Sequence, residues 1–121
     1  MRVKDAVGRF GEQLAERHLV SAGMTVLDRN WRCPEGELDL VVRDGPTIAF
    51  VEVKTRSTLA FGHPAEAVTA RKAARIHRLA MRWLARWQRE NGSVAAIRFD
   101  LVSVVRLAPG GPSVVHLPGA F

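Results

Sequence analysis

The stretch GELDLVVRDGPTIAFVEVKTR, residues 36–56, decides the fold of the chain. It contains two apolar runs, 38–42 and 48–53, separated by the sequence DGP at 44–46, which is typical of a tight turn. Runs of this length and composition predict two β-strands that pair as a hairpin. Charged side chains interrupt both strands, namely Glu37, Asp39, Glu52 and Lys54. The hairpin is therefore expected to place several charges on a sheet that is otherwise apolar.

The spacing of these charges brings carboxylates together. Successive side chains in a strand point to opposite faces, so Glu37 and Asp39 share one face, as do Glu52 and Lys54. Two carboxylates about 4 Å apart repel each other by about 4 kcal/mol at an effective dielectric constant near 20, and a divalent cation would remove that repulsion. With a lysine beside the cation, the parts are those of metal-assisted phosphodiester hydrolysis; Glu37 is a supporting candidate only. The alternative is an ordinary hairpin whose wet face carries charges that pair with one another.

The order of residues adds a resemblance to a known family. Asp39, followed thirteen residues later by Glu52-Val53-Lys54, resembles the signature of the PD-(D/E)XK nuclease superfamily. A wider set of residues in the same order is similar to the YraN family of small bacterial proteins, across about residues 8–106. That set comprises Gly11-Glu12, Asn30, Gly36-Glu37-Leu38-Asp39, Phe50 to Arg56, Phe61-Gly62, Lys72 and Arg98-Phe99-Asp100. The resemblance implies a restriction-endonuclease-like fold, a similarity to archaeal Holliday-junction resolvases and an endonuclease activity.

The resemblance also implies roles for individual residues. Asp39, Glu52 and the backbone carbonyl of Val53 would bind Mg²⁺ or Mn²⁺. Lys54 would position or activate the attacking water and offset charge in the transition state. Glu12, in the first helix where resolvase-like nucleases have a glutamate, would hold a metal-bound water or a second ion. The alternative for Glu12 is an ordinary solvent-facing position on that helix.

A second candidate surface lies on a helix expected over residues 70–90. Arginines three or four positions apart form a stripe opposite its apolar face, namely Arg71, Arg75, Arg78, Arg82, Arg86 and Arg89. No acidic residue occurs from Ala67 to Arg89, so these like charges repel one another, and nucleic-acid phosphates would relieve the repulsion. We therefore predict that Arg56, Lys72 and the first four arginines of the stripe contact DNA. The alternatives are acidic partners elsewhere on the protein, a harmless basic surface, or a helix that lies on a membrane.

The remaining elements complete an α/β fold. Beside the hairpin, the patterns predict helices over 5–22 and 70–90 and strands over 24–32 and 94–106. The order αβββαβ, with a mixed central β-sheet flanked by helices, is that of the restriction-endonuclease-like core that the resemblance implies. Whether residues 113–117 add an edge strand stays open, and Asp100 is expected to pair with Arg98 or Arg56. We expect a single domain over residues 1–121, with a core at about 5–106 and a tail at 107–121.

Composition narrows the partners and the compartment. The net charge is +6 at pH 7 and the isoelectric point is near 11.0, which suits a polyanionic partner such as DNA. Cys33 is the only cysteine, so the chain forms no internal disulfide, and none of the four histidines completes a zinc-binding spacing with it. No apolar run approaches the length that spans a bilayer. We expect a cytoplasmic protein that acts on DNA, with branched DNA among its candidate substrates and without membrane association.

Two questions about function stay open from the sequence. The first is turnover, because the same fold could serve as a catalytically silent nucleic-acid-binding module, or as a structural protein whose charges pair internally. The intact set of Asp39, Glu52, Lys54 and Glu12 favours the enzyme, since a degenerate relative would usually have lost one member. The second question is assembly: a junction substrate would require a homodimer, and a partner protein could instead supply specificity.

Overall fold

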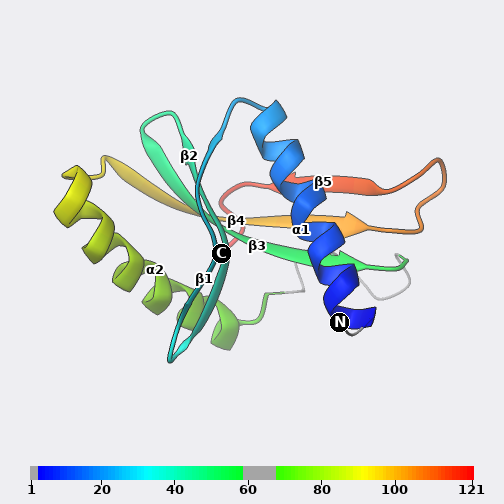
Figure 1. The fold of residues 1–121 in the computed structure, drawn as a ribbon, viewed down its shortest axis with the longest axis horizontal. Coiled ribbons are helices and arrows are strands. Elements are labelled where there is room, and N and C mark those ends of the chain that lie inside the picture. Colours follow the sequence, from blue (N-terminus) through cyan, green and yellow to red (C-terminus); the bar gives the residue numbers. More distant parts are fainter. Residues whose placement is uncertain (1–2, 59–67) are drawn as a thin grey trace.

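The computed structural model describes residues 3–58 and 68–121 (Figure 1). Its elements in chain order are α1 (Val3–Ser21), β1 (Thr25–Cys33), β2 (Gly36–Asp44), β3 (Thr47–Arg56), α2 (Ala70–Asn91), β4 (Ala96–Val105) and β5 (Ser113–Leu117). The predicted α/β class is confirmed, and the last segment does form an additional strand. Phe61 and Gly62, which belong to the pattern that resembles the YraN family, lie outside the described residues. No helix in the described part of the chain is long and apolar enough to cross a membrane.

The strands form one five-stranded mixed sheet in the order β1-β2-β3-β4-β5. Neighbouring strands run antiparallel, except that β3 and β4 are parallel along their whole length. A parallel pair needs a long crossover between its strands, and α2 lies in that crossover. This arrangement is consistent with a restriction-endonuclease-like core.

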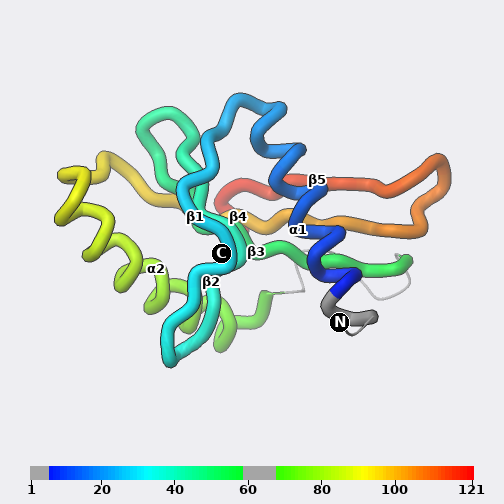
Figure 2. Tube along the Cα trace, viewed as in Figure 1, coloured from blue at the N-terminus to red at the C-terminus, as the bar shows by residue number. Residues whose placement is uncertain are grey.

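The two helices cover opposite faces of the sheet. In β3, Ile48 and Phe50 pack with the buried face of α2, whereas Ala49 and Val51 pack with α1. The central strand is buried on both faces, which explains why its sequence is a continuous apolar run rather than an alternating one. The tube trace shows the β1–β2 hairpin lying beside α2 while α1 crosses the sheet near β3 and β4 (Figure 2).

Local sequence signals fix the ends of α2. The hydroxyl of Thr69 accepts a hydrogen bond from the Lys72 backbone N–H at 3.2 Å and caps the N-terminus. Gly92 ends the helix at a φ of 86°, a backbone conformation that glycine adopts without strain, and its N–H donates to the Gln88 carbonyl. The buried face consists of Ile76, Leu79, Ala80, Trp83 and Leu84. The helix predicted over 70–90 is confirmed to within one residue; of its predicted apolar stripe, four residues are buried, whereas Trp87 is half-buried and Leu84 is buried in addition.

A buried carboxylate ties the C-terminal tail to the sheet. Asp100 in β4 is 0% exposed, and its carboxylate accepts two hydrogen bonds from Arg98 at 2.8 and 2.9 Å. The Gly119 backbone N–H donates to it at 3.0 Å, and Nε2 of His116 lies 2.8 Å from it. Beyond these contacts, the Phe121 ring packs against the Phe99 ring. Asp100 pairs with Arg98, one of its two predicted partners, and serves as a structural anchor in the sheet.

Candidate active site

The site is formed where β2 and β3 separate. Their pairing begins at Asp44 and Thr47 beside the turn, and it ends at the pair Leu40 and Val51. Beyond that pair, β2 continues alongside β1, whereas β3 continues alongside β4. Asp39 is the first β2 residue past the paired segment, and its Oδ2 accepts a hydrogen bond from a β3 backbone N–H at 2.9 Å. The two strands thus diverge beyond Leu40 and Val51, and we call the space between residues 36–39 of β2 and residues 52–56 of β3 the fork.

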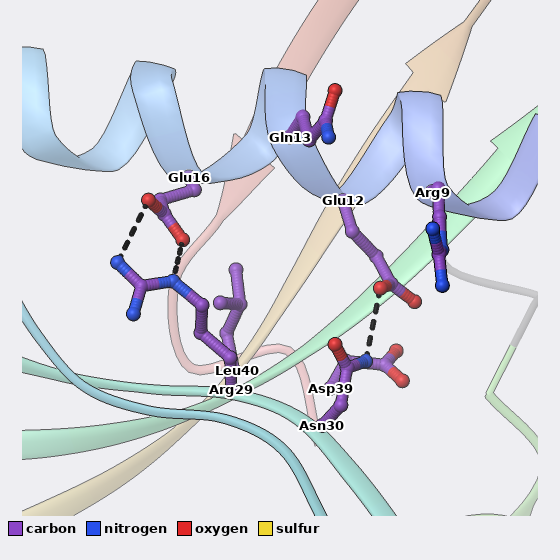
Figure 3. Close-up of a pocket in the computed structure, with 8 residues that line it drawn as sticks. All are labelled: Arg9, Glu12, Gln13, Glu16, Arg29, Asn30, Asp39 and Leu40. Atoms are coloured by element: carbon purple, nitrogen blue, oxygen red, sulfur yellow. Dashed lines mark hydrogen bonds and ion pairs between the residues drawn. The ribbon is translucent and has the colours of Figure 1, made fainter.

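Asn30 of β1 forms hydrogen bonds with two further carboxylates at the fork. Its φ of 47° is left-handed, a conformation that asparagine adopts more readily than most other residues. The Asn30 Nδ2 donates to Glu12 Oε1 of α1 at 2.9 Å and to Glu37 Oε1 of β2 at 3.0 Å. Figure 3 shows Glu12 pointing from α1 toward Asn30, with Asp39 beside it. Asn30 belongs to the resemblance pattern, but the sequence did not identify it as a site residue.

Glu52 and Lys54 lie on the other side of the fork. Glu52 has only 13% of its side chain exposed, and its Oε1 lies 2.9 Å from Nζ of Lys72 in α2. These three residues and Glu12 line a cavity of about 370 Å³. A second cavity of about 390 Å³ is lined by Glu12 and Asp39 among others (Figure 3). The four residues predicted to be catalytic therefore line two cavities that share Glu12.

The carboxyl group of Asp39 is largely buried and has other carboxylates as neighbours. Burial raises the pKa of Asp39 to about 8, the neighbouring charge of Glu52 adds to the shift, and Glu12 and Glu37 contribute further. The hydrogen bond from the Val53 N–H acts in the opposite direction and lowers the pKa. The carboxyl group of Asp39 is thus largely protonated at pH 7, because ionisation would add another negative charge to a crowded, partly buried patch.

Each of the three carboxylates predicted to bind a metal has a donor from within the chain on one of its oxygens. Among residues 3–58 and 68–121, no three His, Cys, Asp or Glu side chains form a ready-made metal-binding group. Instead Glu12 binds Asn30, Glu52 binds Lys72, and Asp39 binds a backbone N–H. Each donor contacts one oxygen of its carboxylate, and carboxylate oxygens are the ligands that Mg²⁺ and Mn²⁺ prefer. The donor set therefore fits such an ion, provided that these contacts exchange.

The backbone at Val53 fits the predicted ligand set. In a regular strand the N–H and C=O of one residue point to the same side. The Val53 N–H points toward Asp39, so its carbonyl also faces the fork rather than β4. The carbonyl oxygen is therefore on the side where the carboxylates gather.

A close helix–strand contact positions Glu12. Gly11 is buried, and a Cβ on this residue would lie 1.7 Å from Oγ1 of Thr55 in β3. Only glycine lets α1 approach the strand this closely, and the approach places the next residue, Glu12, beside the fork. The Gly11-Glu12 pair in the sequence thus combines a packing requirement with a functional side chain.

Two glycine substitutions in α1 test this contact. Gly11→Ala is expected to destabilise the protein by about 1–3 kcal/mol, because α1 or Thr55 must move to make room. Gly8→Ala is the matched control, since a Cβ there meets no atom of the described residues within 4 Å, and it should stabilise the helix by up to about 1 kcal/mol. Urea denaturation of both variants measures the difference. Equal effects of the two substitutions would show that α1 does not need its close approach to β3.

The predicted DNA-binding residues fall into separate places. All six arginines of the stripe are exposed on α2. Arg82 forms an ion pair with Glu35 in the β1–β2 turn, and this contact chiefly, with smaller contributions from Cys33 and Arg78, lowers the pKa of Glu35. The remaining arginines of the stripe, Arg71, Arg75, Arg86 and Arg89, pair with no carboxylate within the described ranges. Arg56 ends β3 opposite Val105 of β4, whereas Lys72 faces the acidic residues of the fork.

The fold and the site define a small α/β protein with a restriction-endonuclease-like core and a patch of carboxylates and lysines at a strand fork. The chain belongs to the UPF0102 family, whose model, described as uncharacterised protein family UPF0102, matches residues 11–104. It is 60% identical to a UPF0102 protein of Frankia alni over 121 residues, which cover 100% of this chain and 98% of that protein. It is 56% identical to a UPF0102 protein of Beutenbergia cavernae over 119 residues, or 98% of each chain. The family-level prediction is confirmed, because YraN proteins are members of UPF0102.

Proposed function

We propose that this protein is a metal-dependent endonuclease of the PD-(D/E)XK superfamily that hydrolyses phosphodiester bonds in DNA. One observation carries the proposal. Asp39, Glu52 and Glu12 come from three different elements, and burial, together with the charges of Glu52 and Glu12, raises the pKa of Asp39 to about 8. A protein gains nothing structural from such crowding, whereas a bound divalent cation turns it into a favourable interaction.

Each residue at the fork would have a separate role in phosphodiester hydrolysis. Asp39, Glu52 and the Val53 carbonyl would hold Mg²⁺ or Mn²⁺, which supplies Lewis-acid stabilisation of charge on the phosphate. Lys54 is exposed in the same cavity, where its ammonium would orient the attacking water and offset developing negative charge. Glu12 would orient a water molecule or help to hold a second ion, and Asn30 fixes its position.

The exposed arginines of α2 would bind the DNA backbone. Phosphate contacts of this kind position a duplex without selecting a sequence. Arg71, Arg75 and Arg78 lie on the same helix as Lys72, so a backbone bound along α2 would pass close to the fork. Arg56 and Arg82 would extend this surface at its two ends. Branched or junction DNA is the substrate that similarity to the resolvases favours.

The test is cleavage of a labelled DNA panel. Linear, single-stranded, flapped and four-way-junction DNA are incubated with Mn²⁺, with Mg²⁺ or with EDTA. We expect metal-dependent cutting that Glu52→Gln reduces by about 10²–10³-fold, because this variant keeps the side-chain shape but loses the ligand charge. Glu90→Gln removes an exposed charge at the end of α2 and is the matched control, with activity near that of the wild type.

The other outcomes of this assay have definite meanings. Tight binding to one DNA shape without cutting would support the alternative, a catalytically silent nucleic-acid-binding module of the same fold. Absence of both cutting and binding would overturn the proposal and leave the arginine stripe as plain surface. Equal loss of activity in Glu52→Gln and Glu90→Gln would place the chemistry elsewhere.

A further inference from the structure

Lysine is rare in this chain and concentrated at the fork. Of the eighteen basic side chains, three are lysines, namely Lys4, Lys54 and Lys72, and the rest are arginines. Two of the three line the same cavity as Glu12 and Glu52. A lysine ammonium is a compact, strongly hydrated point charge, whereas the guanidinium fork of arginine holds a carboxylate at two points. Lysine at this place therefore gives a contact that exchanges more easily than an arginine contact.

The position of Lys72 separates it from the arginine stripe. It lies in the first turn of α2, where the Thr69 cap fixes its backbone. Its side chain is 30% exposed and its Nζ lies 2.9 Å from Glu52 Oε1, whereas the neighbouring Arg71 is exposed and pairs with no carboxylate in the described ranges. Lys72 is thus the cation through which α2 reaches the acidic residues of the fork.

The contact occupies the ligand that a metal would need. A divalent ion binds carboxylate oxygens at about 2.0–2.1 Å for Mg²⁺, and an ammonium on the same oxygen would repel it. The Oε1 oxygen of Glu52 would therefore serve either Lys72 or the metal. An ion that took this oxygen would leave Lys72 without its carboxylate, in the cavity of about 370 Å³ that Lys54 also lines. Two ammonium groups in one cavity favour an anion such as a phosphate.

We propose that Lys72 is an exchangeable counter-cation of Glu52, which a divalent metal displaces and which then binds a phosphate of the DNA. The inference rests on the proposed function and adds to it a coupling between metal loading and DNA binding through one side chain. Such coupling is reciprocal, so DNA that binds Lys72 also favours the metal-loaded state. In the metal-free protein the same lysine neutralises a largely buried carboxylate and keeps the fork intact.

Manganese titration of three variants tests the exchange. Lys72→Met is expected to bind Mn²⁺ about fivefold more tightly than the wild type, because the competing ammonium is gone. Lys72→Arg is expected to bind Mn²⁺ more weakly than the wild type, because a guanidinium holds Glu52 at two points. Arg71→Met removes an adjacent positive charge that does not contact Glu52 and should leave the affinity within about twofold of the wild type. Electron paramagnetic resonance of free Mn²⁺ gives all four affinities.

The salt dependence of DNA binding supplies the second readout. In EDTA, the wild type and Lys72→Met should show the same slope of log affinity against log salt, because Lys72 is engaged by Glu52. With Ca²⁺ bound, the slope of the wild type should be steeper than that of Lys72→Met by about 0.9. This difference corresponds to one additional phosphate contact. A lysine that only stabilises the fold would change the unfolding midpoint in Lys72→Met and neither of these quantities.

The outcomes separate this inference from the function on which it rests. If the wild type binds Mn²⁺ and both Lys72 variants bind it with the same affinity as the wild type, the proposed exchange of Lys72 for the metal is wrong. The proposed metal site is then still supported. If Lys72→Met does not fold, Lys72→Arg still decides, since an affinity equal to that of the wild type would overturn the exchange. If no protein binds Mn²⁺, both the exchange and the proposed nuclease fail.

Discussion

Replacing Asp100 by alanine is expected to destabilise the protein by about 3–5 kcal/mol, the usual cost of removing one partner from a buried charged network. The carboxylate is fully buried and receives hydrogen bonds from Arg98 and from the Gly119 backbone, with His116 in contact. Its removal leaves a guanidinium without its main partner and takes away the contacts of His116 and Gly119 with this carboxylate. Urea denaturation at pH 7 measures the loss.

Asp44→Ala is the matched control for that substitution. Asp44 also binds Arg98, at 3.0 Å, but 41% of its side chain is exposed, so its loss should cost less than about 1 kcal/mol. Burial alone would raise the pKa of Asp100, yet the bonds from Arg98, Gly119 and His116 outweigh it and hold the pKa below the usual 3.8. The stabilisation by Asp100 is therefore present above about pH 4 and is lost as the pH falls through the lower folded-state pKa. Equal costs for the two variants at pH 7 would contradict this role for Asp100.

Replacing Asp39 by asparagine is expected to have the opposite effect on the metal-free protein. Burial and the charges of Glu52, Glu12 and Glu37 raise the pKa of Asp39 to about 8. The folded protein therefore holds a proton that the unfolded chain gives up near pH 4, so stability falls as the pH rises from 4 to 8. Asp39→Asn removes this penalty and keeps an oxygen that can accept from the Val53 N–H. We expect a gain on the order of 2 kcal/mol at pH 8.5 in EDTA.

The pH profile of that gain distinguishes its cause. Thermal unfolding of the wild type and Asp39→Asn in EDTA, from pH 5 to pH 9, should give curves that diverge as the pH rises and converge toward pH 5. A constant difference across this range would point to packing rather than to ionisation. A loss of stability at pH 8.5 would contradict the picture of an electrostatically crowded fork.

The two aspartates show what could and could not be predicted from the sequence. Their surroundings differ: Asp100 has a complete set of donors, whereas Asp39 has one N–H and three acidic neighbours. The sequence singled out Asp39 because it occurs in an ordered pattern with Glu52 and Lys54, and the structure brings these residues and Glu12 to one fork. The helices, the hairpin and the stripe on α2 were predictable because they depend on local periodicity, turns and caps.

The features that were not predicted depend on tertiary structure, namely on where the pairing of two strands ends and where a helix packs on the sheet. Asn30 joins Glu12 and Glu37 only because β1 adopts a left-handed backbone opposite the end of the β2–β3 pairing. Lys72 was predicted to contact phosphate along with the arginines of α2, and nothing in its spacing indicated an ion pair with Glu52. A signal was present in the composition, because Lys72 is the one lysine of a helix whose other basic side chains, apart from His77, are arginines.

Metal binding coupled to proton release tests the central claim, that the carboxylates around Asp39 form a divalent-metal site. Titration calorimetry with Mn²⁺ at pH 7, in two buffers of different ionisation enthalpy, reports both the affinity and the protons released. We predict that the wild type binds Mn²⁺ and releases about one proton, because Asp39 must ionise to become a ligand, and that Asp39→Asn loses both signals. Binding that releases no proton and is unchanged in Asp39→Asn, or no binding by the wild type, would contradict the account.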